Sequence, residues 1–468
     1  MFSRRPSRTL IPSCLMNRAS VTEVRPSCQS SELRSHAELY HQQPSTQYSA
    51  GNAWNLNNNG NINNNNKYNK FYAVPLSESN DKGNDIGGYI VPVGEIYDAY
   101  CECLRNKART FSAMKFTLDL DKNIRQLWKS LNDRTYTIGR SIAFIVEHPV
   151  KREVFAADFR DRVVHVWMCK KLVPLFEEYL PDCMSSNRVG KGTSYAINYA
   201  YRLIEDVSQG YTADAWIWKF DLQGFFMSID KRILNAKLQQ FIDERYFAPD
   251  KSVLKWIAEK VIMHCPQKTC IRKSKLCAWE GLRADKSLFT QDEFHGMPIG
   301  NLPSQIFANF LLSDMVRYLH AHGFRCVQYV DDVVVVYRNK AEILSFIPQF
   351  RLWLKDSLGI TLHPRKCYIQ HFSKGVAFVG GIIRPHRIYV SHRSYRKALG
   401  KTHWIAQGGG TLSEALATVN SYLGLARHFY AYKLRKRLAE MLFSRFRDAI
   451  CFNENYKQMI ISHGSFSR

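Results

Sequence analysis

The chain has 468 residues, and its 65 Lys and Arg outnumber its 41 Asp and Glu, so the formal net charge is +24 and the isoelectric point is near 9.5. A hydrophobic fraction of 45%, with 13% aromatic residues, excludes a disordered or fibrous protein for most of this length. Apolar runs fall short of the roughly 18–20 residues of a membrane span, so no membrane partner is expected. The positive charge favours a polyanionic partner, most commonly a nucleic acid, over a merely solvated basic surface.

Twelve cysteines are scattered without the spacing of a disulfide framework, which indicates reduced thiols in a cytosolic protein. His264, Cys265, Cys270 and Cys277 lie close enough in sequence to bind zinc, but they lack paired C-x-x-C spacing. Lysine and arginine residues between them would repel a cation. We therefore interpret this basic loop as a nucleic-acid contact or a solvated insertion, and keep zinc as the lesser alternative.

Residues 1–85 differ in composition from the rest of the chain. They are polar, and residues 52–69 hold 11 Asn in 18 positions. Asparagine forms helices poorly and favours turns, so this low-complexity stretch is not expected to build an ordered core. We predict a disordered extension.

From residue 93 onward, amphipathic helices alternate with short apolar strands. The first helix begins at Val93 and has Ile96, Tyr100 and Cys103 at helical spacing. The other predicted helices cover 118–131, 158–180, 231–242, 253–263 and 304–320, with a helical tail from about 395, and the predicted strands are 216–221, 326–329 and 333–337. This order predicts an α+β fold in which an antiparallel sheet has helices on one face.

The tail is strongly basic. Residues 384–447 contain 13 Lys and Arg but only two acids, Glu414 and Glu440. Such a strip is suited to binding a phosphate backbone.

Three carboxylates are predicted at strand ends. Asp331 and Asp332 join two apolar strands, and Asp221 closes a third. Adjacent buried carboxylates repel one another and need a neutralising cation, for which Mg²⁺ with its hard oxygen ligands is suited. Together they could hold two metal ions about 4 Å apart, one activating a 3′-hydroxyl and one stabilising pyrophosphate. Because successive strand side chains point to opposite faces, we expect Asp331 to share the site with Asp221 more directly than Asp332 does.

These residues carry a family resemblance. The Tyr329-Val330-Asp331-Asp332 segment resembles the YxDD motif of reverse transcriptases, and 221–226 (DLQGFF) resembles their first carboxylate motif. Residues 296–305 (GMPIGNLPSQ) are similar to the motif that precedes the YxDD hairpin, and the resemblance extends over roughly 93–445. It implies a right-hand polymerase with helical fingers, an antiparallel palm sheet and a basic helical thumb.

Among reverse transcriptases, the chain most resembles those of diversity-generating retroelements. Residues 299–305 have the form IGxxxSQ, whereas group II intron enzymes usually have QGxxxSP, and residues 152–165 and 190–193 also match the retroelement group. Pro303 departs from the Thr that is common in that group. No HNH-type cysteine and histidine segment follows the thumb region, which argues against an intron maturase.

The predicted domain boundaries follow the resemblance. They are 1–85 for the extension, 86–215 for the fingers with the start of the palm, 216–383 for the palm with a basic insertion at 264–290, and 384–468 for the thumb and C-terminal tail.

The resemblance also implies site roles. Leu222 joins the three aspartates at the metal site. The implied nucleotide-binding residues are Arg152, Lys151, Arg160, Phe226, Ile299, Gly300 and Gln305. The implied primer or template contacts are Tyr329, Gly380, Gly381, Arg435, Lys436 and Arg437.

Each role has a physical rationale and a simpler alternative. A guanidinium at Arg152 suits two phosphate oxygens, although a surface or helix-capping cation is possible there. A flat ring at Phe226 leaves no room for a 2′-hydroxyl, whereas core packing is the expected role of Phe225. An apolar Ile299 removes a hydrogen bond that Gln could make, which fits the error-prone copying of template adenines in this family. Gly380-Gly381 could equally be an ordinary hairpin turn.

The predicted function is RNA-directed DNA synthesis with two Mg²⁺ ions and dNTPs, giving adenine-mutagenised cDNA from a template repeat. Expected partners are the template RNA, the cDNA and a small basic accessory variability protein, in the cytoplasm of a bacterium, phage or related mobile element. A reverse transcriptase of a phage-defence, retron or group II intron-like system is the nearer alternative, and a non-catalytic nucleic-acid-binding protein is the distant one.

The asparagine-rich segment has a possible origin in this function. Replacing the adenines of Asn codons with other bases yields many amino acids and no stop codon. The template repeat could therefore overlap the 5′ end of this reading frame, and residues 50–75 would then be its translation. A low-complexity linker is the alternative.

Overall fold

The computed structural model describes residues 90–105, 107–148 and 150–462. The extension predicted at 1–85, with its asparagine-rich stretch, lies outside the described residues. Helices and mainly antiparallel sheets are mixed along the described chain, which confirms the predicted α+β class.

The central sheet has the strand order β5-β6-β3-β7, with all neighbours antiparallel. Its strands are β3 (Trp216–Leu222), β5 (Arg325–Tyr329), β6 (Asp332–Tyr337) and β7 (Leu362–His371). On β6, Val333 and Val335 join one hydrophobic cluster, whereas Val334 and Val336 join another. Both faces of the sheet are therefore covered, which explains the continuous apolar run of β6. The expectation of helices on a single face is wrong.

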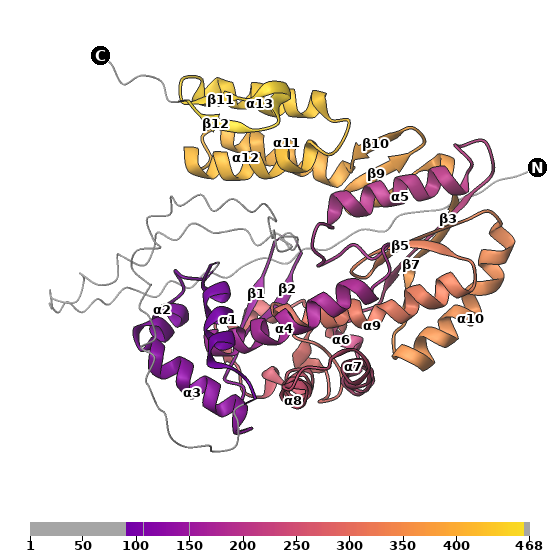
Figure 1. Cartoon of the computed structure of the whole chain (residues 1–468). Coiled ribbons are helices and arrows are strands. Elements are labelled where there is room, and N and C mark those ends of the chain that lie inside the picture. The colour runs from indigo at the N-terminus through magenta and orange to yellow at the C-terminus, as the bar shows by residue number, and fades with distance from the viewer. Residues whose placement is uncertain (1–89, 106, 149, 463–468) are drawn as a thin grey trace, which may run out of the picture. The chain divides into compact units, whose positions relative to one another are not determined.

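The larger cluster contains Val333 and Val335 and joins this face of the sheet to core residues of helices that precede β7 in the chain (Figure 1). Their bounds are α1 (Val93–Arg105), α2 (Phe111–Leu118), α3 (Leu120–Asn132), α4 (Phe159–Tyr179), α7 (Lys231–Arg245), α8 (Lys251–Met263), α9 (Leu302–Ala321) and α10 (Lys340–Leu358). At its centre, the ring of Trp218 on β3 meets the ring of Phe350 on α10, with centroids 5.3 Å apart. Aromatic packing of this kind fixes the sheet against the helical layer.

The opposite face is covered by α5 (Thr193–Val207) and by the C-terminal elements. These are β8 (Val376–Phe378), β9 (Gly381–Arg384), β10 (Arg387–Val390), α11 (His392–Ala406), α12 (Leu412–Ala426), α13 (Tyr432–Phe446), β11 (Ile450–Phe452) and β12 (Met459–Ile461). A capping box between Thr411 and Glu414 defines the start of α12. The predicted helical tail is confirmed, but the β11–β12 hairpin was not predicted, because its strands are only three residues each.

The region predicted as helical fingers also contains a sheet. Strand β1 (Ile142–Val146) pairs antiparallel with β2 (Arg152–Ala156) and parallel with β4 (Ile271–Arg272), which comes from the basic loop. The prediction of helical fingers did not include these strands. The strands escaped prediction because they are short and because β4 joins the sheet from more than 100 residues away.

Glu153 on β2 anchors the basic loop. Its carboxylate accepts hydrogen bonds from Trp279 Nε1 at 2.7 Å, Ser287 Oγ at 2.8 Å and Leu288 N at 2.6 Å, and only 1% of the residue is exposed. One buried acceptor therefore ties together segments 126–135 residues apart in sequence.

We expect Glu153→Ala to lower the free energy of unfolding by about 2–4 kcal/mol, because it leaves buried donors unsatisfied. Glu147→Ala is the matched control. Glu147 lies on the loop after β1 with 56% of its side chain exposed, so the change should cost less than about 1 kcal/mol. Urea unfolding of both variants measures the difference, and equal stabilities would contradict this anchoring role.

Candidate active site

The turn between β5 and β6 is strained and tightly held. Val330 adopts φ +58°, a conformation that β-branched residues rarely adopt. Its N–H donates to Ser186 Oγ at 3.1 Å, and its carbonyl accepts from the Gln328 side chain. Ser186 in turn donates to Asn309 Oδ1 at 2.8 Å. Because Ser186, Gln328 and Asn309 are all buried, this network fixes where the following Asp331 lies.

The antiparallel register brings the third acid to this turn. Asp221 on β3 is directly opposite Asp332 on β6. The charge of Asp221 contributes to the raised pKa of Asp331, and the Asp332 carboxylate lies 3.0 Å from Lys219 Nζ. The three predicted carboxylates therefore converge where β3 pairs with β6. The expectation that Asp331 is nearer than Asp332 to Asp221 stays a prediction, because the strand register pairs Asp221 with Asp332.

Two lysines that were not predicted neutralise these acids. Lys219 precedes Asp221 by two positions on β3 and is largely buried, with 17% of its side chain exposed. Lys366 on β7 forms an ion pair with Asp221, and 59% of its side chain is exposed. Period-two spacing places Lys219 on the same face as Asp221, so it was detectable in the sequence. Lys366 was not, because it comes from β7, 145 residues further along the chain, and meets Asp221 only through the long-range β3–β7 pairing.

The pKa values of Asp331 and Asp332 indicate that the two lysines do not fully neutralise the acids. Burial, followed by the charge of Asp221, raises the pKa of Asp331 to about 7. Burial also raises the pKa of Asp332, against the opposing effect of Lys219. A nearby cation would stabilise the ionised carboxylates. Because carboxylate oxygens are hard ligands, this group of acids fits a divalent cation such as Mg²⁺.

The motif at 296–305 lies beside the first carboxylate motif because a short antiparallel contact joins them. Met297 N donates to Phe226 O at 2.7 Å, and Gly296 N donates to Ile229 O at 2.9 Å. Phe226 belongs to α6 (Phe225–Ser228) and is half-buried, whereas Phe225 is 3% exposed and lies in the core. The side chain of Phe226 is thus only partly covered, five residues after Asp221.

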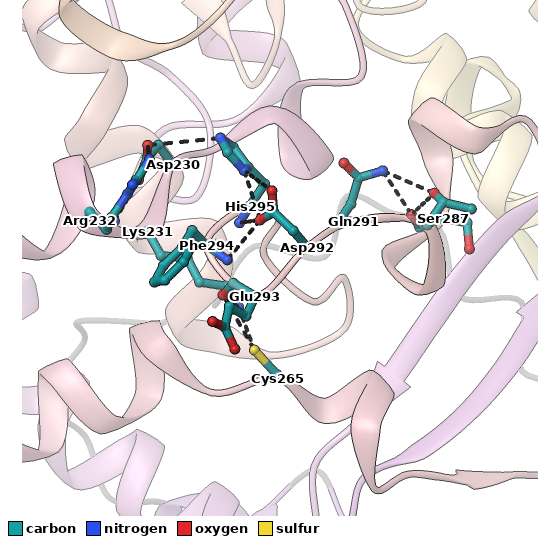
Figure 2. Close-up of polar contacts among 11 residues, drawn as sticks. Asp230, Lys231, Arg232, Cys265, Ser287, Gln291, Asp292, Glu293, Phe294 and His295 are labelled. Atoms are coloured by element: carbon teal, nitrogen blue, oxygen red, sulfur yellow. Dashed lines mark hydrogen bonds and ion pairs between the residues drawn. The ribbon is translucent and has the colours of Figure 1, made fainter.

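The residues just before this motif are held in place by an ionic network (Figure 2). His295 contacts Asp292 at 2.8 Å and Asp230 at 3.9 Å, and Asp230 also pairs with Arg232. Fully buried Lys231 donates to the carbonyl of Glu293 at 3.2 Å. The end of the basic loop is thus fixed to the start of α7.

Ile299 and Gly300 adjoin strand β2. Phe155 N donates to Ile299 O at 2.8 Å, and Ile299 is half-buried. Gly300 has φ +114°, and a Cβ added there would lie 2.6 Å from Val154 Cγ1. Only glycine therefore allows this close approach of the motif to β2.

The predicted triphosphate cations differ in their surroundings. Arg152 is exposed at the start of β2. Lys151 Nζ donates to Glu280 O at 2.7 Å. Arg160 contacts the Thr137 carbonyl and lies over the Tyr136 ring, 5.2 Å from its centroid. Gln305 is exposed in the first turn of α9. Of the three cations, Arg152 is thus the freest to meet a ligand.

The residues predicted to contact the primer or template also differ in their surroundings. Tyr329 is half-buried at the end of β5, and Gly380 has φ +85° in the turn before β9. A Cβ on Gly381 would lie 2.9 Å from the Phe429 ring, so the turn packs closely on the C-terminal region.

On α13 only two of the three predicted cations face solvent. Lys436 and Arg437 are exposed, but Arg435 is 7% exposed and donates to Asn455 O and Ala426 O at 3.0 and 3.1 Å. Arg435 therefore serves the packing of its own region.

The raised pKa of Asp331 predicts a pH-dependent stability. Its carboxyl holds a proton more tightly in the folded than in the unfolded chain, so ionisation costs stability as pH rises from about 4 through 7. In urea unfolding with EDTA at pH 8, we expect the free energy of unfolding of Asp331→Asn to exceed that of the parent by about 2 kcal/mol. This difference should disappear near pH 4, where the Asp331 carboxyl is protonated in both the folded and the unfolded chain. Asp356→Asn, an exposed site on α10, is the control. A pH-independent difference would contradict the burial of Asp331.

None of the helices in the described part of the chain is long and apolar enough to cross a membrane. A search of curated protein sequences finds no match. Among solved structures, apo telomerase from Candida tropicalis aligns with a TM-score of 0.42 and 11% identity, over 66% of this chain and 59% of that one. A form of it truncated from the C-terminal domain aligns with a TM-score of 0.40 and 12% identity, over 54% and 55%.

Telomerase from Candida albicans, in complex with a fragment of telomeric RNA, aligns with a TM-score of 0.39 and 12% identity, over 65% of this chain and 55% of that one. This chain thus spans little more than half the length of these structures. The family model described as reverse transcriptase (RNA-dependent DNA polymerase) matches residues 157–383, which include all three site aspartates. Residues 157–383 of this chain are thus similar in sequence to the reverse transcriptase family.

Proposed function

We propose that the chain is an RNA-directed DNA polymerase whose active site is formed by Asp221, Asp331 and Asp332. The observation that carries this proposal is the convergence of the three carboxylates at the β3–β6 junction, inside the reverse transcriptase segment. Lys366, the exposed partner of Asp221, can leave without opening the core, whereas buried Lys219 keeps Asp332 in place.

Asp221 and Asp331 would hold the divalent ions, with Asp332 beside them and Leu222 offering only its backbone carbonyl, since its side chain is buried. When bound, two Mg²⁺ ions would activate the primer 3′-hydroxyl and stabilise the departing pyrophosphate. The strained Val330 turn fixes Asp331 in advance, so its position need not be organised during the reaction.

The incoming dNTP would lie between the carboxylates and β2. Arg152 would contact the triphosphate, with Lys151 and Arg160 as neighbouring cations and Gly300 and Gln305 nearby. Phe226 would pack under the sugar and exclude a 2′-hydroxyl. Exposed Lys436 and Arg437 would contact the template or primer backbone, with Tyr329 and the turn at Gly380 and Gly381 near the primer end.

We further propose that this polymerase serves a diversity-generating retroelement in a bacterium, phage or related mobile element, where it acts in the cytoplasm. The motif forms at 152–165 and 299–305 support this. Partners would be the template RNA, its cDNA and a small basic accessory protein. The domain boundaries at 85, 215 and 383 remain part of this proposal.

Substituting the acids should abolish DNA synthesis. We expect Asp221→Asn and Asp331→Asn to lower primer extension on an RNA template, with Mg²⁺ and dNTPs, by at least about 10³-fold, because each removes a metal ligand. Asp356→Asn should retain parental activity. Unchanged synthesis by Asp331→Asn would contradict the proposal, because the DNA would then be made elsewhere than at these carboxylates. If a contaminating polymerase proved to be its source, the alternative of a non-catalytic nucleic-acid-binding protein would be supported.

Ile299 tests the mutagenic role separately. The parent should produce cDNA with errors concentrated opposite template adenines. Ile299→Gln should lower that error frequency about tenfold, since one restored hydrogen bond is worth about 1–3 kcal/mol, whereas Ile299→Val should not. The measurement is cDNA sequencing after synthesis on RNA from the 5′ region and flank of the gene, with any accessory protein encoded beside it. Faithful cDNA from the parent would move the assignment to a defence or retron enzyme.

A further inference from the structure

Three side chains of types that can bind a metal ion lie close together near the β5–β6 strand pair. They come from three separate elements: Cys183 from the loop after α4, His320 from the last turn of α9, and Cys326 from β5. In the part of the chain that the structure describes, one ligand atom from each lies within 4.8 Å of the other two. The polymerase chemistry uses none of these residues.

Their spacing fits a bound tetrahedral ion. His320 Nε2 lies 3.8 Å from Cys183 Sγ and 3.7 Å from Cys326 Sγ. With Zn–S near 2.3 Å and Zn–N near 2.0–2.1 Å, a tetrahedral angle places sulfur and nitrogen about 3.6 Å apart. The two separations are thus already within a few tenths of an ångström of the ligand spacing of zinc.

The backbone holds the two cysteines in this position. Gln328 N donates to Cys183 O at 3.0 Å, and Ser185 N donates to Gln328 O at 3.0 Å, so the Cys183 loop runs parallel to β5. Both cysteines are 1% exposed, whereas His320 is exposed. The cluster is therefore preorganised on its buried side and open to a water ligand on the His320 side.

We propose that Cys183, Cys326 and His320 bind one Zn²⁺ ion, with water as the fourth ligand. Two thiolates neutralise the dication, so the buried side of the site carries no net charge. Soft sulfur and imidazole ligands select zinc over Mg²⁺, whereas the carboxylates prefer Mg²⁺, so the two sites do not compete for the same ion. Binding would displace the remaining thiol protons into the buffer.

The site would brace the catalytic turn. Cys326 precedes Tyr329 by three residues on β5, and the loop of Cys183 supplies Ser186, which receives the hydrogen bond of Val330. A metal that joins the loop, β5 and α9 would hold both sides of this contact. Its role is structural, and no reacting group would touch it.

The direct test is to titrate the reduced full-length chain with Co²⁺ and then with Zn²⁺. We expect one Co²⁺ per chain, with thiolate-to-cobalt charge transfer and tetrahedral d–d bands, both lost when Zn²⁺ displaces it. Cys183→Ser and Cys326→Ser should remove the charge-transfer band. His320→Gln, at an exposed position, should weaken binding at least about tenfold. Zn²⁺ should also raise the melting temperature of the parent by several degrees.

Cys265→Ser is the matched control, because Cys265 lies beside His264 in the basic loop, and it should leave the spectrum unchanged. Three results would overturn the proposal: no Co²⁺ or Zn²⁺ bound by reduced protein, a spectrum that depends on Cys265 rather than on Cys183 and Cys326, or a Cys183–Cys326 disulfide in protein purified without oxygen. None of these results depends on polymerase activity, so the zinc site and the proposed function can fail separately.

Discussion

Mutual repulsion among three carboxylates is the constraint around which this structure is organised. Asp221, Asp331 and Asp332 are brought together by strand register, and burial raises the pKa of Asp331 and of Asp332, which makes their ionised forms costly. Lys219 and Lys366 offset part of that cost in different ways: one is buried and fixed, and the other is exposed and displaceable. Such a site is stable enough to fold and remains receptive to a divalent cation.

The positions of these acids depend on the residues behind them. The β5–β6 turn passes through a conformation that Val330 would not adopt alone, and buried Ser186, Asn309 and Gln328 hold it there. The proposed zinc site adds a further tie between the same loop and β5. The positions of the acids are thus set by buried hydrogen bonds behind the turn, and by the proposed zinc site, rather than by contacts among the acids themselves.

Sequence patterns located most helices, the central strands and the three acids, because hydrophobic period and the YxDD motif are local signals. They missed features that depend on long-range pairing. Lys366 meets Asp221 through the β3–β7 pairing, 145 residues away in sequence, and β4 enters the β1–β2 sheet from the basic loop. The grouping of Cys183 with Cys326 likewise has no local signal, and Arg435 matched a basic strip by composition although it is buried.

The central claim is that the three carboxylates exist to hold two divalent ions. Crystals of the chain with Mn²⁺, an RNA template, a DNA primer and a non-hydrolysable dNTP would test it through the anomalous signal of manganese. The account predicts two peaks about 4 Å apart in contact with Asp221 and Asp331, with Lys366 displaced from Asp221. Bound primer and nucleotide without manganese at these aspartates, and with Lys366 still paired to Asp221, would contradict it.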